Sequence, residues 1–138
     1  LFLASCAPPN CDTPLKRELT TLINRQVTGA DAIHSLRELE LLTGSTVADA
    51  DLLDAVWPTL RADIFLALRY EPMIGSAVDF PISVIGGTED RGIRREELMK
   101  WCSVTTSDFE LSMIPGGHLF MDNNPQRLTS LITRALQA

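Results

Sequence analysis

Two stretches of similar build decide the fold: FPISVIGGTED at residues 80–90 and FELSMIPGGH at residues 109–118. Each begins with a run of aliphatic, aromatic and β-branched residues and ends in paired glycines followed by polar side chains. A helical pattern follows each stretch, over residues 96–104 in the first case and at the end of the chain in the second. Two successive strand–loop–helix units predict parallel strands of an α/β sheet, at about 81–86 and 108–114.

The first residues predict a third strand of the same sheet, and a long helical region follows it. The opening run at residues 1–5 is apolar and is closed by prolines, which cannot donate to a β-ladder. Helical spacing of leucine and isoleucine then dominates residues 13–72. This region is too long for a plain crossover, so we predict a helical lid over the carboxyl ends of the strands. We therefore divide residues 1–138, a partial domain, into a core strand and loop (1–12), a lid (13–72) and a C-terminal core (73–138).

Local signals predict the ends of the lid helices. Thr13 and Asp31 carry the type of side chain that caps helix N-termini, so each predicts a helix start. Gly44 is predicted to end the second helix, because glycine readily adopts the left-handed conformation of a C-cap. Pro58 is predicted to break or kink the third helix, because proline lacks the N–H that a helix interior needs.

Composition and charge exclude several classes of function. The 138 residues are 45% hydrophobic and 22% charged, as in a soluble globular domain. The net charge is −6 and no strongly basic run occurs, so nucleic acid is not an expected partner. Charged residues interrupt every apolar stretch well before the roughly 20 residues that a membrane span needs. We therefore expect no membrane attachment.

The cysteines and the first residues bear on location and completeness. Cys6, Cys11 and Cys102 are an odd number without a second Cys/His pair, so we expect no metal site and no cofactor. Free thiols in the cytoplasm are the favoured interpretation, and a Cys6–Cys11 disulfide is the alternative. The chain has no initiator methionine, and its opening apolar run is too short for a signal peptide. We expect it to begin within a longer polypeptide.

Asp90 is the first candidate for chemistry. It follows a predicted strand and two glycines, a position from which a carboxylate can accept the Nδ1 proton of a histidine and stabilise the imidazolium. Glu89 is the competing acid, and the spacing favours Asp90. The structural alternative is that Asp90 is a turn residue or caps the helix near Arg94.

His118 is the second candidate, and it is the partner that Asp90 requires. The paired glycines before it allow a sharp turn that aims an imidazole into a cleft. One loop, one helix and one strand separate it from Asp90, so the two loops are predicted to lie side by side. Acid before base is also the chain order of α/β-hydrolases. The other histidine, His34, lies in a predicted helix without ligand-like neighbours and is expected to be a packing or surface residue.

With these motifs the chain resembles the type II thioesterases of polyketide and nonribosomal peptide assembly lines, over its whole length. The matching segments are Leu1-Phe2-Leu3-Ala4-Ser5 with Ala7-Pro8, Leu60-Arg61-Ala62-Asp63 with Tyr70, Gly86-Gly87-Thr88-Glu89-Asp90, Trp101, and Pro115-Gly116-Gly117-His118-Leu119-Phe120. Departures from the family pattern are Cys6, where a basic or small residue is usual, and Leu119, where an aromatic residue is usual.

The resemblance implies a fold, an activity and a partner. The fold would be the C-terminal part of an α/β-hydrolase, with about three strands of the parallel sheet and a helical lid insertion. The activity would be hydrolysis of acyl thioesters from the phosphopantetheine arms of acyl or peptidyl carrier proteins, which removes stalled or wrong acyl groups. In this resemblance Asp90 orients the imidazole and His118 is the general base.

A nucleophile is the part of a triad that the chain does not supply. No Gly-x-Ser-x-Gly elbow occurs, and Gly44-Ser45-Thr46 and Gly75-Ser76-Ala77 have the wrong spacing. Cys102 is predicted to lie within a helix, away from any strand-to-helix turn. We expect a serine and the oxyanion hole in an N-terminal half upstream of Leu1. The fragment alone would then be inactive, and its exposed sheet edge would pair with that half.

Two surface features have open interpretations. The basic cluster of Arg91, Arg94, Arg95 and Lys100 is either a solvated face or a contact for the pantetheine phosphate or an acidic carrier-protein helix. The apolar stripe of the lid is either an acyl-channel wall or ordinary helix packing. The residues of that stripe are Trp57, Leu60, Ile64 and Phe65.

Two other functions are compatible with the sequence. One is a nonenzymatic module, derived from a truncated hydrolase, that binds a carrier protein or an acyl chain. The other is an α/β-hydrolase acting on a different ester or thioester, because one triad serves many substrates and a fold does not name one of them.

Overall fold

The computed structural model describes residues 1–42, 50–71 and 77–137. Its three strands, β1 (Phe2–Ala4), β2 (Ile82–Gly87) and β3 (Phe109–Ile114), form one parallel sheet in the order β1-β2-β3. The predicted strands are thereby confirmed, and each observed end lies within one residue of the predicted end. The other elements are α1 (Pro14–Asn24), α2 (Gly29–Glu38), α3 (Ala50–Arg69), α4 (Arg95–Met99), the 3₁₀-helix η1 (Lys100–Val104), α5 (Phe120–Asn123) and α6 (Pro125–Gln137).

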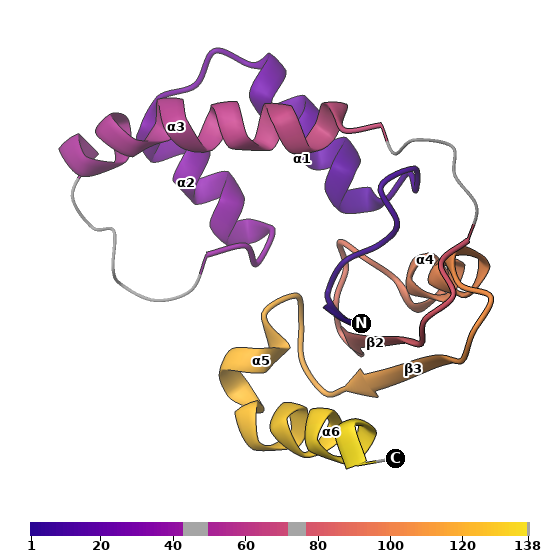
Figure 1. Cartoon of the computed structure of the whole chain (residues 1–138). Helices are drawn as coiled ribbons and strands as arrows, with labels where there is room; N and C mark the ends of the chain where they lie inside the picture. The colour runs from indigo at the N-terminus through magenta and orange to yellow at the C-terminus, as the bar shows by residue number, and fades with distance from the viewer. Residues whose placement is uncertain (43–49, 72–76, 138) are drawn as a thin grey trace.

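Helices cover the two faces of this sheet (Figure 1). Ile82 and Val84 of β2 pack against Leu98 of α4 on one face, whereas Ile85 packs against Phe120 on the other. This alternation follows from the two-residue period of a strand. The amphipathic α6 adds Leu128, Leu131 and Ile132 to the second face.

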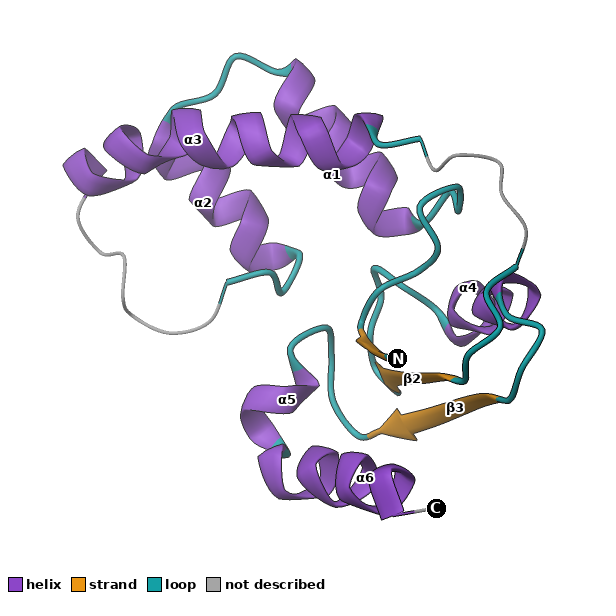
Figure 2. Cartoon of the chain, in the orientation of Figure 1, coloured by secondary structure: helices purple, strands orange, loops and turns teal. Residues whose placement is uncertain are grey.

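Helices α1, α2 and α3 form a layer of their own, called the helical layer below (Figure 2). Its core contains Leu22, Ala32, Ile33, Leu36 and Trp57. Side-chain hydrogen bonds also join the helix ends. The Arg61 guanidinium donates from Nε and Nη2 to the Ile23 carbonyl at 3.1 and 2.7 Å, and the Gly29 N–H donates to Asp54 Oδ1 at 2.6 Å. These bonds satisfy backbone groups that helix ends leave without an intrahelical partner.

The predicted helix ends are partly wrong. Thr13 does cap α1, because its Oγ1 accepts the Lys16 N–H at 3.0 Å. Asp31, in contrast, lies in the first turn of α2, and Thr28 is the N-cap, since the Thr28 hydroxyl already accepts the Asp31 N–H. The helix ends at Glu38, well before the predicted stop at Gly44, which lies outside the described residues.

Pro58 does not break α3. The helix runs without interruption from Ala50 to Arg69, and hydrogen bonds from Asp54 before the proline and Arg61 after it hold α3 against α2 and α1. The predicted helix at 96–104 is present, but its second half is the 3₁₀-helix η1. Within the ranges that the structure describes, no helix is both long and apolar enough to span a membrane.

Candidate active site

The two glycine-bearing loops at the carboxyl ends of β2 and β3 run side by side. The Thr88 N–H donates to the last carbonyl of β3, and the Glu89 N–H donates to the Gly116 carbonyl, both at 2.9 Å. Sheet-like bonding therefore continues beyond the strands. A Cβ at Gly87 would overlap the carbonyl oxygens of Gly116 and Gly117, so the approach requires glycine.

Asp90 and His118 meet where these loops converge. His118 Nδ1 lies 2.9 Å from Asp90 Oδ2. The other oxygen, Oδ1, accepts the backbone N–H groups of Gly92 at 2.8 Å and Ile93 at 3.0 Å. The side chain of Asp90 is 2% exposed and that of His118 is 13% exposed. Asp90 is therefore both a turn residue, as the structural alternative predicted, and the partner of an imidazole. The competing acid, Glu89, is exposed.

The surroundings of Asp90 lower the pKa of its carboxyl, and this shift links protein stability to pH. Burial acts to raise this pKa, but the hydrogen bond and charge of His118, together with the N–H groups of Ile93 and Gly92, outweigh burial and hold it below its usual value. A carboxyl whose pKa is lowered on folding stabilises the fold at a pH above its unfolded pKa of about 3.9. That stabilisation is lost as the pH falls through the folded pKa.

We therefore expect the free energy of unfolding to decrease more steeply with acid in the wild type than in Asp90→Asn, whose amide does not titrate. Urea unfolding between about pH 7 and pH 3 measures both proteins, and the difference between them is expected to be largest above about pH 4. Parallel pH dependences in the two proteins would contradict the assignment of a lowered pKa to Asp90.

Two residues that were not predicted hold the backbone of His118. The Ser5 hydroxyl donates to the His118 carbonyl at 2.7 Å, and the His118 N–H donates to Glu40 Oε2 at 3.1 Å. Ser5 directly follows β1, and Glu40 lies just after α2. Neither contact could be predicted from a local sequence pattern, because each joins segments that are far apart in the chain.

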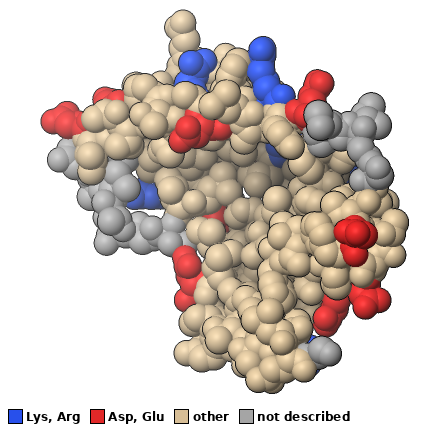
Figure 3. Space-filling view, viewed as in Figure 1, with Lys and Arg blue, Asp and Glu red and all other residues tan. Residues whose placement is uncertain are grey.

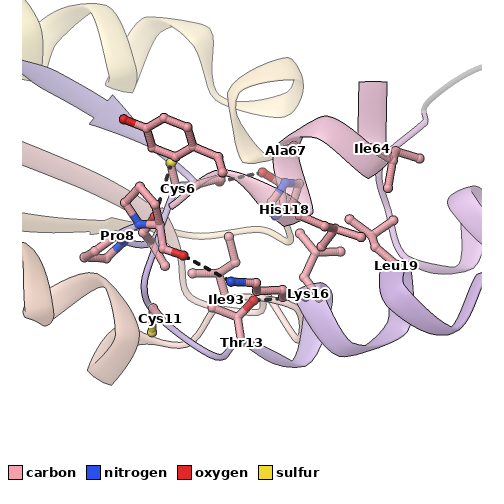
Figure 4. A pocket seen from close by; sticks show the side chains of 16 residues that line it. Cys6, Pro8, Cys11, Thr13, Lys16, Leu19, Ile64, Ala67, Ile93 and His118 are labelled. Atoms are coloured by element: carbon pink, nitrogen blue, oxygen red, sulfur yellow. Dashed lines mark hydrogen bonds between the residues drawn. The ribbon is translucent and has the colours of Figure 1, made fainter. Parts of the chain in front are cut away.

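An apolar cavity of about 520 Å³ opens beside His118. Figure 4 shows its lining, which comes from the loop after β1, from α1, and from the second half of α3. Cys6, Pro8, Leu19, Ile64 and Ala67 are among the lining residues, and Lys16 is the one lysine among them. On the face seen in Figure 3 the molecule is hollowed between the helical layer and the sheet.

Similar proteins are found by sequence. The gramicidin S biosynthesis protein GrsT of Aneurinibacillus migulanus is 27% identical over 105 residues, which are 74% of this chain and 41% of GrsT. Thioesterase TesA of Mycobacterium marinum is 31% identical over 98 residues, which are 67% of this chain and 39% of TesA. No protein-family model matches the chain.

The structural comparison agrees with these relatives. YbtT, a type II thioesterase from the yersiniabactin NRPS/PKS biosynthetic pathway, matches 97% of this chain and 52% of its own length, with a TM-score of 0.78 and 20% identity. The chain has the α/β-hydrolase fold of the type II thioesterases. Both the predicted fold class and the predicted resemblance are thereby confirmed. The chain spans about half the length of the proteins that it matches.

Of the other candidate residues, His34 and Cys102 are described, and both lie on the surface. His34 is a surface residue whose Nε2 lies 3.4 Å from Glu38 Oε1. Cys102 is exposed and belongs to η1. The serines of Gly44-Ser45-Thr46 and Gly75-Ser76-Ala77 fall outside the described residues. In the described part of the chain, no group of three His, Cys, Asp or Glu side chains could hold a metal ion.

The basic cluster after Asp90 and the apolar stripe of the predicted lid lie in different surroundings. The basic residues Arg91, Arg94, Arg95 and Lys100 are all exposed, and the Lys100 ammonium lies 3.3 Å from the thiol of Cys11, which is buried and free. Of the predicted stripe, only Ile64 lines the cavity. Trp57 and Leu60 pack within the helical layer, and Phe65 is partly exposed beneath the Arg69 guanidinium. Helix packing therefore accounts for most of the stripe.

Proposed function

We propose that the full-length protein is a thioesterase that hydrolyses acyl thioesters on the phosphopantetheine arm of carrier proteins. His118 is the general base in this proposal, and Asp90 orients it. The observation that carries the proposal is the 2.9 Å contact between His118 Nδ1 and Asp90 Oδ2 at the edge of an apolar cavity. The names of the similar proteins support it, because they include gramicidin S biosynthesis, thioesterase, and an NRPS/PKS pathway.

The geometry suits a nucleophilic mechanism in two stages. The contact with Asp90 engages Nδ1, and His118 lines the cavity, so Nε2 is the nitrogen left to take the proton of a nucleophile. Attack on the thioester carbonyl and cleavage of the C–S bond transfer the acyl group, and the imidazolium returns its proton to the departing thiolate. Water, activated by the same base, then releases the acid. We assign the nucleophile to a serine of the full-length protein outside this chain.

The proposal also assigns a role to the helical layer. The cavity lies between α1, α3 and the loop after β1, and its lining is mostly apolar, as an acyl chain requires. In this proposal residues 13–72 are the lid, and residues 1–12 and 73–138 are parts of the catalytic core. The carrier protein delivers the substrate to the mouth of the cavity. All three cysteines are free, which suits the reducing cytoplasm.

Comparing two matched substrates tests the proposal. The full-length protein is given an acyl group on the pantetheine arm of a carrier protein, and the same acyl group as a simple oxygen ester. We expect kcat/KM to be about tenfold or more higher for the carrier-bound thioester. A preference for the oxygen ester would indicate a different esterase. Binding of the acylated carrier protein without any turnover would indicate the nonenzymatic module.

A further inference from the structure

The backbone of His118 is held at both of its peptide groups by side chains from distant segments. On one side the His118 N–H donates to Glu40 Oε2 at 3.1 Å, and on the other its carbonyl accepts the Ser5 hydroxyl at 2.7 Å. Glu40 lies just after α2 of the helical layer, and Ser5 directly follows the edge strand β1. Both contacts lie next to the side chain that makes the pair with Asp90.

These two residues share an unusual backbone conformation. In the described ranges, the non-glycine residues with positive φ are Ser5, at 44°, and Glu40, at 58°. Side chains other than glycine disfavour this left-handed region, and such strain persists where the surrounding structure enforces it, often at functional sites. The two left-handed residues of the described chain are thus the two whose side chains bind the backbone of His118.

Glu40 occupies a position where the helix end alone would favour glycine. The Glu40 N–H donates to the Arg37 carbonyl and the Leu41 N–H to the Leu36 carbonyl, both at 2.9 Å. This pair of bonds is a Schellman motif, whose left-handed residue is usually glycine. Glycine would satisfy the end of α2 equally well, but it has no carboxylate to offer His118.

The space around Glu40 supports the same interpretation. A Cβ at Gly117 would overlap the Glu40 carboxylate, so the contact with His118 exists only because residue 117 has no side chain. Glu40 is exposed, so burial among apolar side chains does not account for the position of its carboxylate beside the His118 N–H. It reaches across from the helical layer to the loop after β3.

We propose that Ser5 and Glu40 are positioning residues that fix the backbone of His118 and thereby the direction of its imidazole. This inference rests on the proposed function for its effect on catalysis, but the contacts can be measured without turnover. Glu40 ties the loop of the base to the helical layer, and Ser5 ties it to the end of β1. A shift of either segment would move the base relative to the bound substrate.

Pairs of alanine and glycine variants separate positioning from stability. Glu40→Ala and Glu40→Gly both remove the carboxylate, but only glycine relieves the left-handed strain. We expect the full-length Glu40→Gly to melt about 2–4 °C above Glu40→Ala. Both should lose about threefold to tenfold in kcat with little change in KM, since one hydrogen bond is removed. Glu40→Gln keeps an acceptor oxygen and should stay within about twofold of the wild type.

The same design applies to Ser5, and a nearby carboxylate serves as the control. Ser5→Ala and Ser5→Gly both remove the hydroxyl, so kcat should be lower in both variants. The melting temperature of Ser5→Gly should nevertheless be higher than that of Ser5→Ala, because glycine relieves the left-handed strain. Glu38→Gln removes a surface carboxylate of α2 that contacts His34, and kcat should not change. Amide hydrogen exchange reads the contact directly: exchange at His118 should be faster in Glu40→Ala than in the wild type or in Glu40→Gln.

The outcomes distinguish the two proposals. Wild-type kcat in both Glu40→Ala and Glu40→Gly, or a kcat that recovers in Glu40→Gly along with its melting temperature, overturns the positioning role of Glu40. Unchanged exchange at His118 in Glu40→Ala overturns it as well. A wild-type rate in His118→Ala would instead overturn the proposed function, and the exchange measurement would still decide whether Glu40 holds the backbone of residue 118.

Discussion

Replacing His118 with alanine in the full-length protein is expected to lower kcat for an acyl-carrier thioester by at least about 10⁴-fold, with a much smaller change in KM. In the proposed mechanism the imidazole both takes the proton of the nucleophile and returns it to the leaving thiolate. Loss of one member of a catalytic triad has an effect of this size. Release of the free thiol of the pantetheine arm, measured with a chromogenic reagent, follows the reaction.

The second histidine provides the matched control. The His34 side chain is 75% exposed, and its Nε2 lies 3.4 Å from the carboxylate of the surface residue Glu38, so His34→Ala should retain full activity and the same melting temperature. A rate for His118→Ala within about tenfold of the wild type would remove His118 from the role of base. Equal losses in both histidine variants would point to an effect on folding.

Replacing Gly87 with alanine is expected to destabilise the protein by about 3 kcal/mol, because the new methyl group would overlap two backbone carbonyls. Those carbonyls belong to Gly116 and Gly117, in the loop that carries His118. Backbone cannot rotate away as a side chain can, so the two loops must separate. A displacement of about 1 Å between acid and base would lower kcat by roughly 100-fold. Urea unfolding and thioester hydrolysis measure the two effects.

Gly86→Ala is the control for this experiment. A Cβ at Gly86 would meet the terminal methyl of Leu98, with the end of the Met113 side chain as the next neighbour. Flexible side-chain ends can adjust, so we expect a cost of about 1 kcal/mol and little effect on kcat. If Gly87→Ala were as stable and as active as Gly86→Ala, backbone contact between the loops would not be what holds Asp90 and His118 together.

The parts of the fold that were predicted correctly depend on patterns that are local in sequence. Apolar runs closed by glycine or proline gave β1, β2 and β3, and the glycine pairs indicated where the chain turns toward the site. Parallel strands place such turns at one edge of the sheet, so the sequence alone predicts that Asp90 and His118 lie together.

The features that were missed depend on contacts between distant segments. Glu40 follows α2 in a left-handed conformation without the glycine that normally marks it, and its side chain accepts the His118 N–H. Ser5 is likewise recognisable only once β1 lies beside the loop after β3. Pro58 remains inside a continuous helix because tertiary packing supports α3. The predicted helix end at Gly44 and the serines Ser45 and Ser76 lie outside the described part of the chain.

The two oxygens of the Asp90 carboxylate have different partners. One oxygen holds the loop backbone in place, and the other orients the imidazole. Oδ1 accepts the loop N–H groups, and Oδ2 faces the imidazole. Asparagine can keep its carbonyl toward the loop while turning its NH₂ group toward Nδ1. The ring would then keep its proton on Nε2, which is the tautomer that cannot accept one there. Asp90→Asn would thus keep the loop hydrogen bonds of Oδ1 but turn Nε2 of His118 from a proton acceptor into a proton donor.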